Sequence, residues 1–195
     1  MKKILLLSAV LIFQGCAFKD ATLKVHHSAN AKFNGPIGQA GPIMFSKAKL
    51  IDNREDKVRI GWKKNGYGSN TADITTEQPV ETIVTNAISS GLLSNGHKIV
   101  ESGLVRIEGS VNRFWFETDI NFWSVEFTGD VQCNLKFINT KTDQVFYESE
   151  YSGTYSLKKG GGATKTWQKV MSQAVDNLIE DITFDEDLAE ALQEL

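Results

Sequence analysis

The chain is poor in the side chains that most often carry catalysis or hold metal ions. It has three histidines and two cysteines among 195 residues. Acid–base and nucleophilic catalysis usually require a histidine that the fold places beside its partner. His26 and His27 lie in a polar segment, and His97 follows a predicted helix. We therefore expect no catalytic residues, no metal site and no cofactor, and we do not expect an enzyme.

Two segments imitate binding sites without matching their patterns. Asp52, with Arg54, Glu55 and Asp56, supplies charge but lacks the ligand spacing of a calcium loop. The segment 159–166, KGGGATKT, precedes a predicted helix but lacks the spacing of a phosphate-binding loop. We interpret the first as a surface loop and the second as a flexible connector.

Long hydrophobic runs are also missing, apart from one near the N-terminus. Ile4 to Phe13 form an almost uninterrupted apolar stretch after Lys2 and Lys3. As a helix, ten residues reach about 15 Å, whereas the hydrocarbon core of a bilayer measures about 30 Å. A positive start followed by a short apolar run is typical of a secretory signal. Residues 1–15 are therefore predicted to be a signal peptide.

The sequence LIFQGCAF places Cys16 directly after Gly15 and resembles a bacterial lipoprotein signal. The resemblance implies that Cys16 carries the lipid, with palmitate among its acyl chains, and becomes the mature N-terminus. Two acyl chains anchor a protein stably, so we expect attachment to a membrane through this lipid. The resemblance also implies a location. An aspartate directly after the cysteine would suggest the inner membrane, whereas this chain has Ala17 there, so we expect the outer membrane with the domain in the periplasm. The alternative is a secreted protein with a chance thiol.

Basic side chains are in the minority. Removal of Lys2 and Lys3 with the signal leaves 19 of the 21 basic side chains against 24 acidic ones, a net charge near minus five. A chain of this charge repels the phosphate backbone. We expect no nucleic-acid binding.

Cys133 is the only cysteine left once Cys16 is lipidated, so no intramolecular disulfide is expected. It lies on the apolar face of a predicted strand that alternates from Val125 to Phe137. This pattern indicates a buried, inert thiol. A redox or intermolecular role would need exposure and an electropositive neighbourhood.

The remaining chain divides into a polar segment and a domain. Residues 16–42 are polar and contain the punctuated stretch GPIGQAGP, so we interpret them as the lipidated N-terminus and a flexible tether. Residues 43–195 suffice for a single domain with one core.

The domain combines helical and strand periodicities. Apolar residues at helical spacing predict amphipathic helices over 79–94 and 167–182, and a short helix over 185–195. Alternation predicts strands over 44–51, 97–101, 104–116, 122–138 and 144–157. We predict an α+β fold of two layers, an antiparallel β-sheet with two amphipathic helices packed on one face.

The segment RFWFETDINFWSVEF, residues 113–127, surrounds one predicted hairpin and is rich in aromatic side chains. Five of them are candidate partner contacts: Phe114, Trp115, Phe116, Phe122 and Trp123. Alternation along a strand sends them to both faces, and an exposed aromatic cluster often marks a partner contact. Burial or cross-strand pairing is the more ordinary interpretation, because aromatic side chains are common in strands.

With this order of elements, the chain resembles the YajG family of bacterial lipoproteins. The resemblance is carried by the FQGC signal, the IDNRED loop, the segment PVETIVTNAISSGLLSNGHKIV, and the closing helix WQKVMSQAVDNLIEDI followed by FDEDL. It implies an outer-membrane lipoprotein of poorly defined biochemical role and supplies no active-site residues.

Two classes of function remain open. The first is a non-enzymatic binding or assembly module of the cell envelope, with an envelope protein as the candidate partner. An auxiliary role in an envelope transport system is a specific form of it. The second is an envelope hydrolase that uses loop carboxylates, and a deep pocket with two converging acidic side chains would support it.

Overall fold

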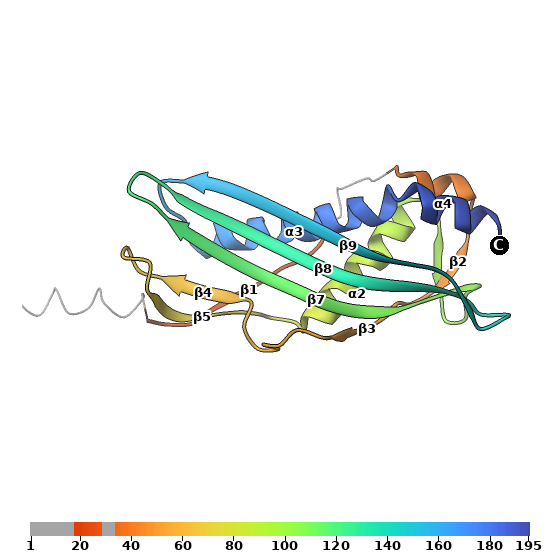
Figure 1. Cartoon of the computed structure of the whole chain (residues 1–195), viewed down its shortest axis with the longest axis horizontal. Helices are drawn as coiled ribbons and strands as arrows, with labels where there is room; N and C mark the ends of the chain where they lie inside the picture. The colour runs from red at the N-terminus through yellow and green to blue at the C-terminus, as the bar shows by residue number, and fades with distance from the viewer. Residues whose placement is uncertain (1–17, 29–33) are drawn as a thin grey trace, which may run out of the picture.

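Three long strands form the centre of the structure, a computed structural model that describes residues 18–28 and 34–195. They are β7 (Val105–Ile120), β8 (Val125–Asn139) and β9 (Gln144–Lys159). β8 pairs antiparallel with both neighbours over nearly its whole length, and short turns join the three (Figure 1). The predicted antiparallel meander is confirmed, and the fold is α+β.

Six shorter strands extend this meander into a nine-stranded sheet. They are β1 (Ala21–Leu23), β2 (Met44–Ser46), β3 (Lys49–Asp52), β4 (Gly61–Lys64), β5 (Asn70–Thr76) and β6 (Lys98–Val100). β3 runs parallel to β7, and β1 runs parallel to β5. The prediction of a wholly antiparallel sheet is therefore wrong. A helical segment lies between β3 and β7, and such a crossover returns the chain in the same direction.

Both predicted amphipathic helices are present, as α2 (Val80–Ser94) and α3 (Thr164–Thr183). α2 ends at Asn95, and Gly96 follows with a positive φ of 88°, which glycine adopts without strain. The predicted terminal helix is α4 (Glu186–Gln193), and the chain also has a short 3-10 helix, η2 (Pro36–Ala40). Asp185 caps α4 by accepting a hydrogen bond from the Leu188 N–H at 3.0 Å.

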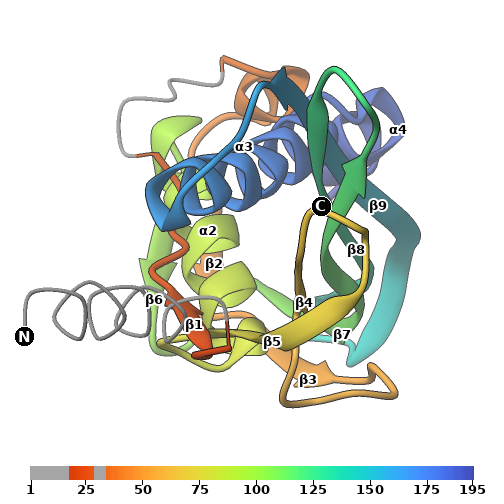
Figure 2. The ribbon, with the colours of Figure 1, turned by 90° about the vertical axis from the view of Figure 1, so that its left-hand side faces the viewer.

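Helix α3 packs on β8 and β9 because glycines on these strands admit its backbone (Figure 2). A Cβ atom added to Gly153 would lie 2.2 Å from the amide nitrogen of Leu178. One added to Gly129 would lie 3.1 Å from the Cβ of Ala174. The close approach buries the apolar stripe of α3, including Val175, in the core.

The described parts of the predicted tether are folded into the domain. Leu23 in β1 and Ile37 in η2 are completely buried, and Ala21 pairs with Ile74 of β5. The Gly35 N–H donates to the side-chain oxygen of Asn95 at 2.8 Å. The prediction of a flexible tether is therefore wrong for residues 18–28 and 34–42. The few apolar side chains of these residues lie in the core. The polar composition of the segment gave no sign of this burial.

Candidate functional site

The turn between β7 and β8 holds the two most exposed members of the predicted aromatic group. Asn121 organises this turn, since its side-chain oxygen accepts hydrogen bonds from the N–H groups of Trp123 at 3.1 Å and Ser124 at 2.9 Å. Its own N–H donates to the carbonyl of Ser124. The closed turn leaves Phe122 88% exposed and Trp123 86% exposed.

Phe122 and Trp123 form a pair. Their ring centroids lie 4.7 Å apart with an interplanar angle of 82°, an edge-to-face contact. The turn fixes the backbone beneath both rings, so they can meet an apolar or amphipathic surface with little loss of backbone entropy. We call this pair the aromatic tip.

The other three candidate contacts are not part of this surface. Phe114 and Phe116 are each 1% exposed and lie in the core, where Phe116 packs against Phe127 and Trp167. Trp115 is half-buried and its indole N–H donates to Glu117 at 3.1 Å. Phe114 and Phe116 as partner contacts are wrong, because the period of two along β7 turns both toward the core.

A further exposed aromatic residue, Tyr67, lies in the turn between β4 and β5 and is 97% exposed. The turn has the same design as the aromatic tip, since the side-chain oxygen of Asn65 accepts hydrogen bonds from the N–H groups of Tyr67 and Ser69 at 3.0 Å each. Sequence reasoning did not single out this tyrosine. The signal was an asparagine followed two residues later by an aromatic residue, as in Asn121 and Trp123.

The loop after β3, which the IDNRED motif spans, is organised by a buried arginine. Arg54 is 8% exposed and forms a two-point ion pair with Asp52, at 3.0 and 2.8 Å. Its guanidinium also donates to the carbonyls of Arg59 at 2.8 Å and Lys57 at 3.2 Å. Arg54 thus has a structural role in closing the loop, and it is far less exposed than a surface-loop residue.

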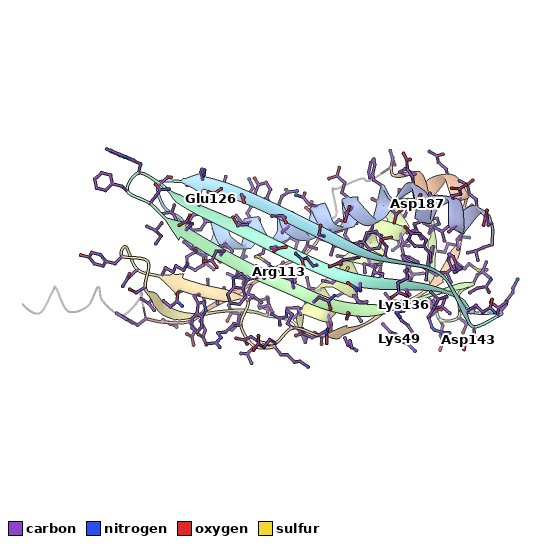
Figure 3. The ribbon with its side chains drawn as sticks, in the orientation of Figure 1. Lys49, Arg113, Glu126, Lys136, Asp143 and Asp187 are labelled. Carbon is purple, nitrogen blue, oxygen red and sulfur yellow. The ribbon has the colours of Figure 1, made fainter. Side chains whose placement is uncertain are left out.

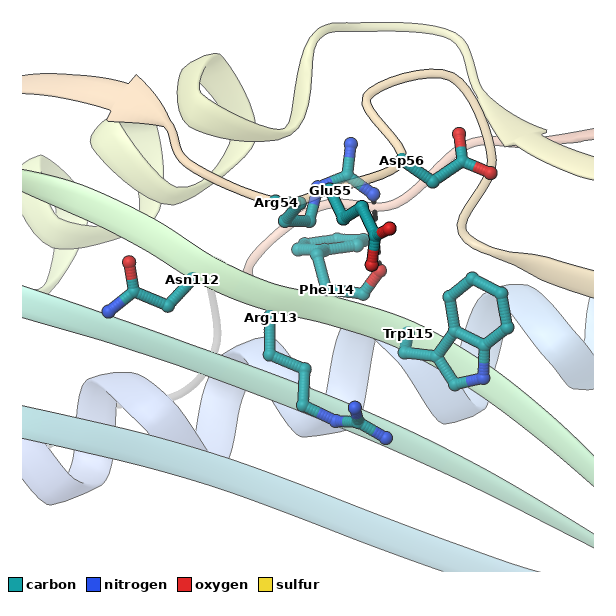
Figure 4. Close-up of a pocket in the computed structure, with 7 residues that line it drawn as sticks. All are labelled: Arg54, Glu55, Asp56, Asn112, Arg113, Phe114 and Trp115. Atoms are coloured by element: carbon teal, nitrogen blue, oxygen red, sulfur yellow. Dashed lines mark hydrogen bonds between the residues drawn. The ribbon is translucent and has the colours of Figure 1, made fainter.

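A pocket of about 370 Å³ lies beside this loop, lined by Arg54, Glu55, Asp56, Asn112, Arg113, Phe114 and Trp115 (Figure 4). Figure 4 shows that its polar side chains diverge, and Arg113 pairs with Asp130 on β8. Asp56 pairs with Arg59 at 2.5 Å, and hydrogen bonds from Arg59 lower the pKa of Asp56 to about 2. A carboxylate held ionised in this way is unsuited to donate a proton, so the pocket gives the hydrolase alternative no support.

Two of the three histidines, His27 and His97, are part of the framework. The side chain of His27 is 5% exposed and its Nδ1 lies 2.7 Å from a carboxylate oxygen of Asp176. The interpretation of His27 as part of a solvated linker is therefore wrong. His97 is buried beside Phe45, its Nδ1 accepts a hydrogen bond from the Ile43 N–H at 3.3 Å, and loss of solvent lowers its pKa. Within residues 18–28 and 34–195, no group of three or more His, Cys, Asp or Glu is placed to hold a metal ion.

Two further polar groups are structural. Cys133 is completely buried, and loss of solvent raises the pKa of its thiol to about 12, as its strand position predicted. Tyr147 and Tyr151 both donate to one carboxylate oxygen of Asp185, at 2.9 and 2.6 Å. Burial and this carboxylate raise the pKa of both phenols. Sequence reasoning missed the pair because the three residues come together only in the folded chain.

The outward face of the meander is charged and paired. Figure 3 shows the labelled side chains Lys49, Arg113, Lys136, Glu126, Asp143 and Asp187 distributed along the molecule. Lys136 pairs with Glu148 at 3.2 Å, and Lys158 pairs with Glu126 at 3.3 Å. Exposed pairs of this kind contribute little to stability. The aromatic tip, with its two exposed apolar rings, remains the candidate contact site.

A family model described as "Uncharacterized lipoprotein" matches residues 47–193 of the chain. No curated protein matches it. In the part of the chain that the structure describes, no helix is both long enough and apolar enough to cross a membrane.

Several solved structures are similar to the chain. Protein XCC0632 from Xanthomonas campestris, of family DUF330, has a TM-score of 0.55 at 10% identity, covering 90% of this chain and 95% of that one. Protein CT253 from Chlamydia trachomatis has a TM-score of 0.49 at 6% identity, covering 80% and 100%. A minor lipoprotein from Acinetobacter baumannii has a TM-score of 0.45 at 10% identity, covering 75% and 92%. The first of these shows a shared fold.

Proposed function

The chain belongs to the Lipoprotein_16 family of uncharacterised lipoproteins, the YajG family, and from this premise we propose that it is a lipid-anchored, non-enzymatic binding module of the cell envelope. In this proposal the signal peptide 1–15 is removed and Cys16 carries the lipid. The protein is held in the outer membrane with its domain facing the periplasm. Support comes from the family and from the FQGC sequence, since Cys16 itself lies outside the described residues.

The aromatic tip is the observation that carries the binding role. Phe122 and Trp123 are large apolar side chains that the fold leaves almost fully in water. The asparagine-closed turn fixes the backbone that carries them. Exposed aromatic groups on a fixed backbone are typical of contact sites, because aromatic rings bury much area with few rotatable bonds. An auxiliary role in an envelope transport system is a narrower form of this proposal.

The anchor is tested by replacing the cysteine. Cys16→Ala should abolish labelling by radioactive palmitate and should release the protein from the membrane fraction or leave an uncleaved precursor. The matched control is Cys133→Ala, which removes the other cysteine and should keep full labelling because that thiol is buried. Palmitate labelling that persists in Cys16→Ala, or that is missing from the wild-type protein, would contradict the proposal.

A further inference from the structure

We propose that the aromatic tip rests on the surface of the membrane that holds the lipid, so that the domain stands on this end. The inference rests on the proposed function, because it needs the lipid on Cys16. In this proposal the exposed rings of Phe122 and Trp123 contact lipid headgroups and the upper part of the acyl chains. Four observations carry it.

The first observation is the length of chain between the lipid and the folded domain. Cys16 precedes Phe18, the first described residue, by two positions, and Phe18 is 69% exposed. Two extended residues span at most about 7 Å. A lipid on Cys16 therefore holds the end of the domain that carries Phe18 close to the bilayer.

The second observation is that Phe18 lies at the same end as the Tyr67 turn. Ala21 pairs in parallel with Ile74 of β5, and the Asp20 carboxylate accepts a hydrogen bond from the Asp73 N–H at 2.9 Å. Residues before Ala21 therefore run alongside β5 toward its start at Asn70, directly after the turn that exposes Tyr67.

The third observation places the aromatic tip at this end too. β4 leads into the Tyr67 turn and runs parallel to β7, with Gly61 opposite Phe116. Lys64 at the end of β4 donates to the carbonyl of Thr118 at 2.8 Å. Phe122 comes four residues later, about 13 Å along a strand direction. Figure 1 shows both turns and the first described residues at one end of an elongated molecule, and Figure 2 views that end.

The fourth observation is chemical. Tyrosine and tryptophan are enriched at membrane interfaces, where the ring meets apolar chains and the polar edge meets water and headgroups. Lys159 lies at the end of β9, paired in register with Val125 beside the aromatic tip, and Lys165 is the second residue of α3, after the intervening glycines. Both are exposed and can reach lipid phosphates. The exposed rings by themselves would suit a protein partner as well as a membrane. The proposed lipid on Cys16 favours the membrane, because it places this end of the domain beside a bilayer.

With the aromatic tip on the membrane, the end of the molecule that carries α4 and the β8–β9 turn points away from the bilayer. β7 has 16 residues, a length of roughly 50 Å at 3.3 Å per residue. With the aromatic tip on the membrane, helix α4 and the β8–β9 turn around Asp143 stand on the order of 50 Å into the periplasm, if the strands run near the membrane normal. That distal end then faces away from the membrane.

The test uses the full-length lipidated protein, reconstituted in vesicles of phosphatidylethanolamine and phosphatidylglycerol, with a photo-crosslinking amino acid at one position at a time. Positions 123 and 67 should give lipid adducts by mass spectrometry. Position 141, in the β8–β9 turn, is the matched control at the far end and should give none. Lipid adducts missing at 123, or equal yields at 123 and 141, would overturn the inference.

A second arm separates this inference from the proposed function. The double variant Phe122→Ser with Trp123→Ser should stay in the membrane fraction through its lipid while the lipid adduct at position 67 falls. Unchanged adducts at 67 would overturn the membrane contact but leave the anchor intact. Loss of palmitate labelling in the wild type would instead refute the anchor. In cells, a protein adduct at 123 in place of lipid would assign the aromatic tip to a protein partner and reject the membrane contact.

Discussion

Arg54 closes the loop between β3 and β4, because the several N–H donors of its guanidinium bind three residues of the loop. Its planar guanidinium reaches the carboxylate of Asp52 and the carbonyls of Arg59 and Lys57 together. A lysine keeps the charge but has a single nitrogen and cannot hold these acceptors at once. The buried acceptors would then lose their partners.

Arg54→Lys should therefore lower the free energy of unfolding by about 1 to 3 kcal/mol, the usual cost of an unsatisfied buried polar group. Urea unfolding followed by circular dichroism measures it. The matched control is Arg113→Lys, because the Arg113 side chain is 49% exposed and pairs at the surface with Asp130. That change should cost about 0 to 1 kcal/mol. Equal losses in both variants would contradict the role given to Arg54.

His97 makes stability depend on pH. Burial lowers its pKa in the folded protein, so the unfolded chain binds this proton more readily. Stability from the neutral ring is then fully present above the unfolded pKa of about 6.5 and is lost as pH falls toward the folded pKa. One such group contributes a slope of at most about 1.4 kcal/mol per pH unit.

His97→Asn should make the free energy of unfolding fall less between pH 7.5 and pH 5 than it does in the wild type. Asparagine keeps an acceptor for the Ile43 N–H but does not titrate. The exposed His26 provides the control, since His26→Asn should keep the wild-type decline. The assignment fails if urea titrations show the same pH dependence with and without His97.

At the scale of elements, the contact of α3 with the meander depends on Gly153. The strand carries no side chain there, and the backbone of Leu178 occupies the space. Edge strand β9 is further protected by α3, because Asp181 accepts from the Ser152 N–H and Asn177 donates to the Thr154 carbonyl, each at 2.8 Å. A strand edge with satisfied backbone groups is a poor template for pairing with another chain.

Gly153→Ala should cost about 1 to 3 kcal/mol of unfolding free energy, the range for overpacking, because backbone atoms cannot move aside as a side-chain end can. Gly160→Ala is the matched control, since a Cβ there meets nothing within 4 Å, and should change stability by no more than about 0.5 kcal/mol. Thermal or urea unfolding of both variants decides the matter. A silent Gly153→Ala would mean that α3 sits further from β9.

At the scale of the whole molecule, the N-terminal segment belongs to the domain. Ile37 in η2 lies in the same core cluster as residues of α2, α3 and β7. One core implies one cooperative unfolding transition for the described chain. A segment that looked dispensable by composition therefore contributes to global stability.

Ile37→Ala should destabilise the whole domain by about 2 to 5 kcal/mol, as loss of a buried isoleucine side chain does. Ile51→Ala is the matched control, because Ile51 in β3 is 65% exposed, and it should cost about 0.5 kcal/mol or less. Chemical unfolding monitored by near- and far-UV circular dichroism measures both. If Ile37→Ala unfolds with wild-type stability, the segment is not part of the cooperative core.

Much of the fold was predictable where the information is local. The stripes of α2 and α3 and the alternation of β7 to β9 follow from which residues can face a core, and these elements lie where periodicity placed them. The three-residue strand β1 and the five-residue 3-10 helix η2 carry too few positions for a period to show, so both were missed. Parallel pairing was missed because it depends on a crossover between distant segments.

The candidate site was predictable only where it depends on local sequence. The aromatic segment identified a hairpin that carries exposed rings, but its sequence could not separate the buried Phe114 and Phe116 from the exposed Phe122 and Trp123. That difference depends on where the strand ends and the turn begins. The contact of His27 with Asp176 and the pair of tyrosines on Asp185 join residues far apart in the chain. No local pattern records such contacts.

By itself, the sequence determined the class of fold and the family, because periodicity and contiguous motifs are local properties of a chain. The lipid on Cys16 stays a prediction from the same kind of local signal. Only the tertiary structure decided which aromatic side chains remain in water and which end of the molecule carries them. It brings Phe18, Tyr67 and the aromatic tip to one end through parallel pairing of β1 with β5 and of β4 with β7. That arrangement arises from strand register, which is set by contacts between residues distant in the sequence.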